Sequence, residues 1–388
     1  MSDVRAVTGN VAASIGAALC RPDVIAAYPI TPQSAVVEYL AQMIADGKLD
    51  STMVQVESEH AAMNLVMGAA AAGGRVFTAS SAQGLALMYE PYFRMSTLRF
   101  PMVMAIASRD MTSPETIWSG QQDTMSVRDS GWMQVYVENN QEIMDMVIQG
   151  FRLAEEKEIL IPVTVCYDGF YLSHLTERVD VPDADKMKEF LPPYKARTVL
   201  DPNSPIALDP LTPGPIFWRY RANHLRAMQK ALTKIDEVNN EFAKMFGRNW
   251  GGAIQTYRCE DAEIVITTIG SMTGTAREAV DAARENGIKV GLLKVRYMRP
   301  FPAQQVAEVL KGKRAWTAVD RSVNFGWNAG SVYVEAKAAI GDNTPVGFSV
   351  IAGLGGADIA THDFYKVIEL LNSDEGSRRV ETLWLGEN

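Results

Sequence analysis

The sequence contains only three cysteines among its 388 residues. Cys20, Cys166 and Cys259 are far apart and form no C-x-x-C pair, so this chain alone cannot supply the four thiolates of an iron–sulfur cluster. The four histidines also lack the spacing of a metal site. We therefore predict that the cysteines are buried, reduced thiols and that this chain alone holds no metal ion.

Long apolar runs and runs of basic residues are absent too. No stretch of 18 apolar residues and no charged-then-apolar leader occurs, which argues against a membrane span or a secretory signal and favours a cytoplasmic protein. The formal net charge of -9 makes a nucleic-acid partner unexpected. A Walker P-loop, an H-E-x-x-H motif and a Ser-His-Asp signature are also missing.

Short apolar segments alternate with helical sequence over residues 1–176, which we assign to a first domain. Such an order predicts right-handed crossovers and a parallel sheet covered by helices on both faces, which is a doubly wound α/β fold. The hydrophobic content of 47% is enough for the large core that this fold needs. The segments that we predict as strands are 23–28, 52–56, 75–78, 101–106 and 161–167.

The alternation stops at residue 177, and residues 177–215 hold eight of the 18 prolines. This density excludes a long helix and a central strand, and predicts an ordered connector. Apolar residues at intervals of three and four predict a long helix over 217–246, so residues 177–250 combine a connector with a helix. Residues 251–388 are expected to form a second, smaller doubly wound domain. Its predicted strands are 262–269, 289–295, 315–319 and 346–350.

Glu59 lies at the junction between an apolar run, residues 52–59, and a tract of very small residues, 61–74. The run is typical of a buried strand and the tract of a closely packed helix. Open parallel sheets bind their ligands at the carboxyl ends of the strands, so a carboxylate at this junction is placed to hold a ligand. Glu57 is a competing candidate, because alternation along a strand would point both carboxylates to the same face.

Two other polar residues follow predicted strands. Thr31 precedes Pro32, a pattern typical of a helix N-cap with proline at the first helical position, and such a helix start offers donors to an anion. Arg109 follows the strand that ends near Ser108 and could bind a carboxylate through two hydrogen bonds, although an ordinary ion pair is the plainer interpretation. The glycine-rich residues 353–356 complete neither a dinucleotide fingerprint nor a P-loop.

These segments together resemble the alpha subunit of the pyruvate:ferredoxin oxidoreductase family, the 2-oxoacid:acceptor oxidoreductases, which use thiamine diphosphate. The similarity covers nearly the whole chain, in the same order. The motifs that carry it are residues 28–33, 57–60, 78–85, 122–123, 167–170, 298–302 and 353–356.

The resemblance implies a thiamine diphosphate pyrimidine-binding domain followed by a transketolase C-terminal-like domain. In the family, a glutamate at the place of Glu59 hydrogen-bonds N1′ of the aminopyrimidine, which promotes loss of the thiazolium C2 proton. The resemblance therefore favours Glu59 over the other carboxylate, and it places Tyr28 and Pro29 beside the cofactor. It implies that Thr31 and Arg109 bind the 2-oxoacid, so the catalytic residues would be Thr31, Glu59 and Arg109.

What the chain lacks indicates partner subunits. The G-D-G and N-N pattern that holds the magnesium ion of thiamine diphosphate is absent, so a beta subunit is expected to supply the diphosphate and Mg²⁺ half of the site. The 4Fe-4S clusters are expected on a ferredoxin-like cluster subunit, beside a gamma subunit. The implied reaction converts a 2-oxoacid and coenzyme A to acyl-coenzyme A and CO2, and reduces ferredoxin or a nicotinamide-linked subunit.

Two alternatives are a noncatalytic structural subunit of such a complex and a non-redox thiamine diphosphate enzyme. Retention of all three implied catalytic residues argues against the first. The chain departs from the family pattern at Gly120 and Gln121, where relatives commonly have Asp-His, and at Ala357, where many have arginine. The first departure predicts an enlarged, neutral acyl pocket that accepts pyruvate or a bulkier, aromatic 2-oxoacid such as phenylglyoxylate. The residues expected to line its apolar wall are Tyr28, Met111, Trp118 and Met125.

Overall fold

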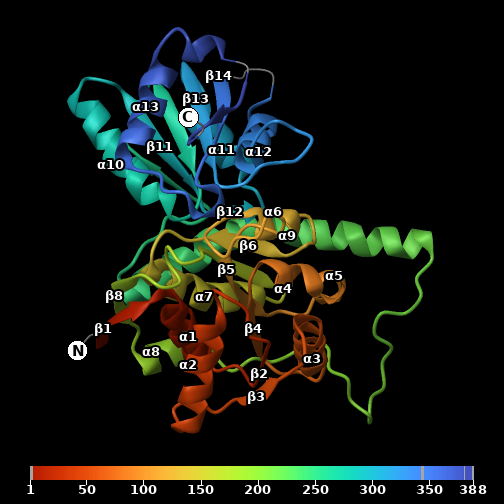
Figure 1. Ribbon diagram of the computed structural model, residues 1–388. Helices are drawn as coiled ribbons and strands as arrows, with labels where there is room; N and C mark the ends of the chain where they lie inside the picture. Colours follow the sequence, from red (N-terminus) through yellow and green to blue (C-terminus); the bar gives the residue numbers. More distant parts are fainter. Residues whose placement is uncertain (1–2, 342–344, 380, 387–388) are drawn as a thin grey trace.

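The computed structural model, described over residues 3–341, 345–379 and 381–386, contains two large sheets with helices on both sides of each (Figure 1). The first sheet has seven strands in the order β12-β6-β7-β5-β4-β2-β3. All neighbouring strands in it are parallel except β12 and β6. The strands are β2 (Val24–Ala27), β3 (Thr52–Gln55), β4 (Val76–Ser80), β5 (Val103–Ser108), β6 (Met133–Tyr136), β7 (Val163–Asp168) and β12 (Tyr297–Arg299).

Helices pack on both faces of this sheet, and their small residues set the distance of approach. A Cβ atom on Gly16 of α1 would lie 2.9 Å from Met144 O of α7, so only glycine allows these two helices to pack this closely. The helices are α1 (Gly9–Cys20), α2 (Ser34–Ala45), α3 (Glu59–Ala71), α4 (Ala82–Leu87), α5 (Tyr89–Thr97), α6 (Gln122–Ser126) and α7 (Asn140–Ala154).

The middle of the chain wraps the first domain. Strand β8 (Thr176–Val181) pairs only with the antiparallel β1 (Asp3–Thr8) in the described part of the chain, and α8 (Ala184–Phe190) follows it. The connector then passes the end of α3, where Leu200 N donates to Ala71 O over 2.8 Å. The long helix α9 (Gly214–Phe246) comes next and confirms the helix predicted over 217–246.

The second sheet has six strands in the order β15-β14-β13-β10-β11-β9, with β9 antiparallel to β11. Its strands are β9 (Ile254–Tyr257), β10 (Ile264–Thr268), β11 (Val290–Val295), β13 (Ala315–Asp320), β14 (Val346–Ile351) and β15 (Leu383–Trp384). Helices α10 (Met272–Glu285), α11 (Ala303–Leu310), α12 (Ser331–Ile340) and α13 (Thr361–Asn372) cover it, with short 3-10 turns η1 (Leu354–Gly356) and η2 (Gly376–Arg378).

A fully buried ion cluster joins the two domains. The Glu142 carboxylate of α7 lies 2.6 Å from Lys294 Nζ and 2.5 Å from Arg296 Nε, both at the end of β11. Burial acts to raise the pKa of Glu142, but the two cations outweigh it and lower that pKa to about 2. The cluster therefore stays charged in the interior and fixes the second domain against the first.

The predicted doubly wound α/β architecture is confirmed, and each predicted strand overlaps an observed one. Six short strands were not predicted, because each has only two or three residues or is interrupted by polar residues. Strand β12 comes from the part of the chain that was predicted to form the second domain, yet it pairs with β6 in the first sheet. No local sequence pattern indicates this pairing. No helix in the described residues is long and apolar enough to cross a bilayer. The unpredicted strands are β1, β6, β8, β9, β12 and β15.

Candidate active site

Glu59 is the first residue of α3, and its side chain is only 5% exposed. Ser58 caps the helix by accepting a hydrogen bond from Ala61 N at 3.2 Å. Burial raises the pKa of the Glu59 carboxyl group, and no other residue in the described ranges donates a hydrogen bond to it. The carboxylate is therefore an open acceptor in a sheltered place.

Glu57 lies elsewhere, in the exposed turn before the helix. Strand β3 ends at Gln55, so the expectation that strand alternation points both carboxylates to one face was wrong. The strand is also not fully buried, since Thr52 and Gln55 are exposed at the sheet edge. The geometry thus separates two glutamates that periodicity alone could not.

The first turn of α4 closes over the Glu59 carboxylate. A Cβ atom on Gly84 would lie 2.5 Å from Glu59 Oε1 and would overlap the Ser80 hydroxyl, so the helix can approach only with glycine at this position. Ser80 Oγ is buried and has no hydrogen-bond partner among the described residues. The Glu59 carboxylate and the unpaired Ser80 hydroxyl thus both lie against Gly84, an arrangement that fits a ligand that donates a hydrogen bond.

Arg109 follows β5 directly and is also 5% exposed. Its Nη2 donates to Gln83 Oε1 over 2.6 Å, while its Nε is buried without a partner in the part of the chain that the structure describes. Within that part no carboxylate lies within ion-pair distance of the guanidinium, and burial lowers its pKa. Consecutive residues of α4, Gln83 and Gly84, therefore contact Arg109 and Glu59 and bring the two side chains to one edge of the sheet.

Asp123 holds this arrangement together, and sequence reasoning missed its importance. Its Oδ2 accepts the backbone amides of Ala82 at 3.0 Å and Arg109 at 3.1 Å, and its Oδ1 accepts Thr124 N at 2.7 Å. Ala82 has a φ of 34°, which costs a non-glycine residue on the order of 1 kcal/mol. Burial raises the pKa of Asp123 to about 7. One carboxylate thus fixes the turns that follow β4 and β5.

Thr31 lies at the end of β2, at the same carboxyl edge, and is exposed. Helix α2 begins only at Ser34 with Gln33 at the N-cap position, so the predicted N-cap role of Thr31 was wrong. Gln33 is fully buried, and both polar atoms of its side chain lack partners among the described residues. Tyr28 and Pro29 are exposed and line a groove of about 630 Å³ beside α2 and β3.

The loop after Arg109 differs from its predicted form. A Cβ atom on Gly120 would overlap the Asp110 carboxyl group, so glycine at this position makes room for Asp110 and leaves no enlarged pocket. Gln121 is buried and donates to Asp168 Oδ1 at 3.3 Å. Met125 is buried in a hydrophobic core made mostly of second-domain residues, so its predicted place in an acyl wall was wrong.

Trp118, another predicted wall residue, is exposed and stacks at a tilt on Phe170 with ring centroids 4.5 Å apart. Met111 is half-buried in the same loop. The glycine-rich residues 353–356 contact this loop rather than presenting free amides: Gly355 N donates to Asp110 Oδ2 and Gly356 N to Ser119 O, each over 2.6 Å. This segment therefore joins the two domains.

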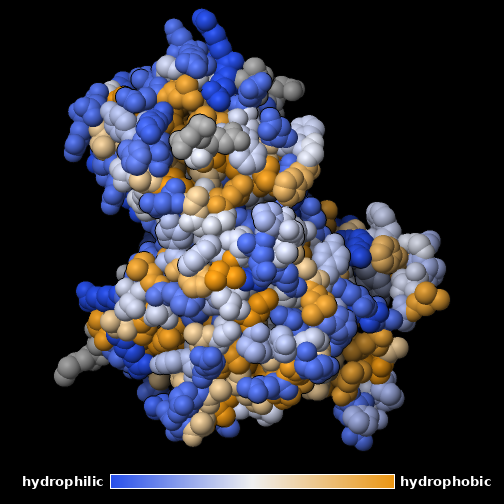
Figure 2. Space-filling model, in the orientation of Figure 1, coloured by the Kyte–Doolittle hydropathy of each residue, from blue (hydrophilic) through white to orange (hydrophobic). Residues whose placement is uncertain are grey.

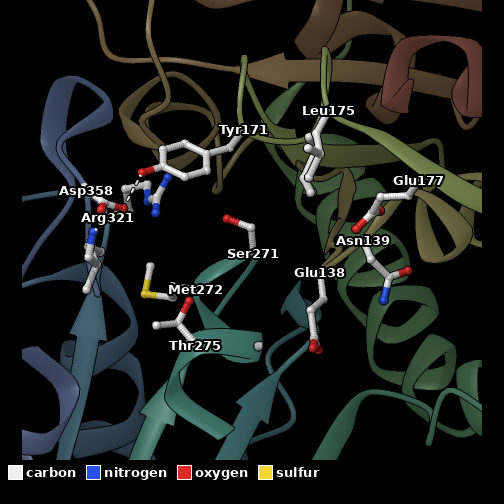
Figure 3. Close-up of a pocket in the computed structure, with 13 residues that line it drawn as sticks. Glu138, Asn139, Tyr171, Leu175, Glu177, Ser271, Met272, Thr275, Arg321 and Asp358 are labelled. Carbon is white, nitrogen blue, oxygen red and sulfur yellow. Dashed lines mark hydrogen bonds between the residues drawn. The ribbon is translucent and has the colours of Figure 1, made fainter. Parts of the chain in front are cut away.

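A second cavity of about 370 Å³ lies between the domains, at the start of α10 (Figure 3). In it Tyr171 donates to Asp358 over 2.8 Å, and Ser271 N donates to the buried Asp168 carboxylate over 3.0 Å. None of the predicted site residues lines this cavity. The candidate active site is instead the carboxyl edge of the first sheet, where α4 contacts both Glu59 and Arg109.

Comparison of the sequence with known protein families identifies the family of this chain. Residues 15–240 match the family described as "Pyruvate flavodoxin/ferredoxin oxidoreductase, thiamine diP-bdg", and residues 262–364 match "Pyruvate:ferredoxin oxidoreductase core domain II". This chain belongs to the pyruvate:ferredoxin oxidoreductase family. Glu59, Arg109 and the α4 turn all lie in its thiamine diphosphate-binding part.

Members of the pyruvate:ferredoxin oxidoreductase family resemble the chain along its length. The alpha subunit of NADH-dependent phenylglyoxylate dehydrogenase from Aromatoleum evansii is 43% identical, covering 98% of this chain and 94% of the relative. Pyruvate synthase subunit PorA from Methanothermobacter thermautotrophicus is 41% identical, covering 99% and 98%. The relatives therefore include proteins named for an aromatic and for an aliphatic 2-oxoacid.

A solved structure shares the fold. The 2-oxoglutarate:ferredoxin oxidoreductase from Magnetococcus marinus, determined with 2-oxoglutarate, coenzyme A and succinyl-CoA bound, superposes with a TM-score of 0.75 at 22% identity. The match covers 95% of this chain and 65% of that one, so this chain spans just under two thirds of its length. At this identity the likeness establishes the two-domain fold alone.

Proposed function

We propose that this chain is the alpha subunit of a thiamine diphosphate-dependent 2-oxoacid:acceptor oxidoreductase. The assembled enzyme would convert a 2-oxoacid and coenzyme A to acyl-coenzyme A and CO2, with reduction of an electron acceptor. The observation that carries the proposal is the buried Glu59 carboxylate, which is open to a donor and is joined through α4 to the buried Arg109.

Glu59 suits a protonated or polarised ring nitrogen of the cofactor. Its carboxylate has no other donor among the described side chains, and Gly84 is the residue that packs against it. Thiamine diphosphate, when bound, would supply the carbon nucleophile that the reaction needs. Because burial raises the pKa of Glu59, the residue can take up and return a proton at the ring nitrogen. Tyr28 and Pro29 would contact the cofactor from the neighbouring strand end.

Arg109 suits the carboxylate of the substrate. Gln83 holds its Nη2, and the unpartnered Nε leaves the guanidinium able to donate to an anion that enters the recess. Thr31, exposed at the end of β2, would offer its hydroxyl to the polar oxygens of the same substrate. A charged donor that is already buried and oriented loses little freedom when the substrate binds.

The rest of the cofactor site would belong to partner subunits. The three cysteines are buried at separate places, and burial raises the pKa of each thiol, which suits reduced core residues of a cytoplasmic protein. We therefore place the diphosphate and Mg²⁺ on a beta subunit and the 4Fe-4S clusters on a ferredoxin-like cluster subunit, beside a gamma subunit. Electrons would pass to ferredoxin or to a nicotinamide-linked subunit.

Pyruvate and phenylglyoxylate remain the two candidate substrates. The relatives named for these acids are similarly identical to this chain, and Tyr28 and Trp118 offer exposed aromatic surface at the site edge. The ratio of kcat/KM for the two acids in the purified complex tests this choice. A strong preference for pyruvate would show that these aromatic residues do not contact the acyl group.

Co-expression with the partner subunits tests the function as a whole. We expect the chain alone to be colourless, inactive and poor at binding thiamine diphosphate, because it offers half a site. The complex should be brown and should reduce an acceptor when given a 2-oxoacid and coenzyme A. A complex without clusters that only decarboxylates the acid would favour the non-redox alternative, and a complex that turns over normally without Glu59 would favour a structural subunit.

A further inference from the structure

The apolar stripe of α9 continues past the edge of the first domain. From His224 onward one face of the helix packs on that domain, and His224 Nε2 lies 2.8 Å from Gly131 O. Four and seven residues earlier, the same face carries Tyr220 and Phe217, which are both exposed. The stripe is therefore longer than the surface that it covers. Its buried members are His224, Ala227, Met228, Ala231 and Ile235.

The first turns of α9 are exposed, with Phe217 and Tyr220 at the edge of an open cavity of about 440 Å³ that the connector also lines. Every residue from 213 to 221 is exposed, and Figure 1 shows the green helix extending away from the domain at this end. We call residues 213–226 the α9 projection. Exposed apolar groups of this size mark interaction sites. The large exposed side chains of the projection are Ile216, Phe217, Trp218, Tyr220 and Leu225.

Hydrophilic residues stand beside these apolar side chains in the part of the molecule that projects at the right of Figure 2, and the charged residues of 213–226 are all arginines. The sequence has no acidic residue between Asp209 and Asp236, although the whole chain carries a net charge of -9. A groove of about 570 Å³ at the base of the projection has Glu158 as its one acidic lining residue, and Glu158 is paired with Lys230 at 2.5 Å. The cations that line the groove are Arg99, Lys157, Arg197, Arg226 and Lys230.

The cations of the groove are close enough to act on one another. Burial lowers the pKa of Arg99, and the neighbouring Arg197 lowers it further. The Arg99 guanidinium donates hydrogen bonds to the carbonyl oxygens of Leu160 and Ile159, which are neutral acceptors. The local excess of positive charge would attract an anionic partner.

We propose that the α9 projection is a docking helix for another subunit of the assembly, one that presents an acidic surface around an apolar groove. The proposal rests on the multi-subunit function proposed above. Phe217 and Trp218 would enter the groove as anchors, and the arginines would bind carboxylates at its rim. The base of the projection contacts Arg99, before β5, whereas Arg109 follows β5, so the docked subunit would leave the active edge free.

A matched pair of tryptophans tests the proposal. Trp218 is 65% exposed in the projection, and Trp327 is 67% exposed in the loop before α12. We expect Trp218→Ser to weaken the affinity of the purified chain for the remaining subunits roughly 100-fold, as loss of an anchor residue does. Trp327→Ser should leave that affinity unchanged. Neither variant should lower the melting temperature of the isolated chain, because both side chains are exposed.

A charge variant gives a second readout. Arg219→Glu with Arg226→Glu should weaken assembly and should remove most of its dependence on salt, because the attraction is between exposed charges. Lys188→Glu in α8, which is exposed and distant in sequence, serves as the charge control. Binding is measured by interferometry at several salt concentrations.

Three outcomes would overturn the docking helix. These are unchanged assembly of Trp218→Ser, equal weakening by Trp218→Ser and Trp327→Ser, and a light-scattering result in which Trp218→Ser converts a dimer of the isolated chain to a monomer. The last would identify a second copy as the occupant. A wild-type chain that oxidises 2-oxoacids without assembling would overturn the proposed function itself, whereas normal assembly of Trp218→Ser overturns only this inference.

Discussion

The carboxyl edge of the first sheet leaves the Glu59 carboxylate without a donor from any other described residue, whereas the corresponding edge of the second sheet binds acidic side chains of the first domain through its backbone amides. On the first edge, Ser80 Oγ and Arg109 Nε are buried without partners among the described residues. On the second, the amides of Ser271 and Gly355 donate to Asp168 and Asp110 of the first domain. The same kind of strand end thus serves a ligand in one domain and docking in the other.

Both edges share one device, a fully buried aspartate that accepts backbone amides. Asp123 holds the turns after β4 and β5, while Asp320 accepts Val332 N at 2.7 Å and Tyr333 N at 3.2 Å at the start of α12. Burial raises the pKa of each to about 7. The edges therefore differ in the groups beside the anchored turns: the first holds the Glu59 carboxylate, which has no donor from another described residue, and the second holds amides that bind the first domain.

The largest effect should come from removing the open acceptor of the first edge. Glu59→Gln keeps the size of the side chain but cannot take up a proton, so turnover and C2 proton exchange of the assembled enzyme should fall roughly 10²- to 10⁴-fold. Exchange is measured by NMR in deuterated buffer. The exposed Glu57→Gln is the matched control and should be unchanged; a normal rate for Glu59→Gln would move the assignment to Glu57.

The buried ion cluster should dominate the stability of the domain junction. Glu142→Gln leaves Arg296 buried without a counter-charge and leaves Lys294 with Glu138 alone, at 3.1 Å, so the free energy of unfolding should fall by about 3–5 kcal/mol. Glu263→Gln, which breaks an exposed pair with Lys289, should change it by less than about 1 kcal/mol. Urea unfolding measures both, and equal losses in the two variants would contradict a special role for the cluster.

The pH dependence of this cluster has a defined sign. The folded pKa of Glu142 is about 2, below its ordinary value of 4.5, so its contribution to stability is fully present above about pH 4.5 and is lost as the pH falls through about 2. The decrease in the free energy of unfolding that comes from protonation of Glu142 should therefore be absent in Glu142→Gln, as urea unfolding at several acidic pH values would show.

A smaller effect is expected at the substrate end of the first edge. Arg109→Lys keeps the charge but loses the planar guanidinium with its two parallel donors. The transition-state stabilisation calculated from kcat/KM for the 2-oxoacid should therefore fall by about 2 kcal/mol or more, with assembly intact. Steady-state kinetics measure the loss. Arg128→Lys, a partly buried arginine near the same loop, provides the control. Unchanged efficiency in Arg109→Lys would remove Arg109 from the substrate site.

The smallest predicted effect separates the two buried aspartates. Because each folded pKa lies near 7, above the ordinary 3.8, their contribution to stability increases as the pH falls from about 7 towards 4 and is lost at higher pH. Asp123→Asn and Asp320→Asn should both flatten that slope in urea unfolding. Only Asp123→Asn should also raise KM, about 10-fold, because the amide offers one acceptor oxygen to the three backbone N–H groups that now hold the turn before Arg109. Equal kinetics in the two variants would contradict this difference.

The sequence by itself determined the architecture and the neighbourhood of the site. Hydrophobic periodicity is a local property, so the parallel strands and the long helix α9 were predicted from it. The junction between an apolar segment and a small-residue helix also located Glu59 at a sheet edge. These signals suffice because burial of one face repeats every few residues along the chain.

Only the tertiary structure decided which polar groups are satisfied. Glu57 and Glu59 are two residues apart, yet one is exposed and the other lies under Gly84. Asp110 bonds to Gly355, 245 positions away, and this contact explains why residue 120 is glycine and not a sign of a wider pocket. Hydrogen-bond partners so distant in sequence leave no periodic trace, because they depend on how whole layers pack.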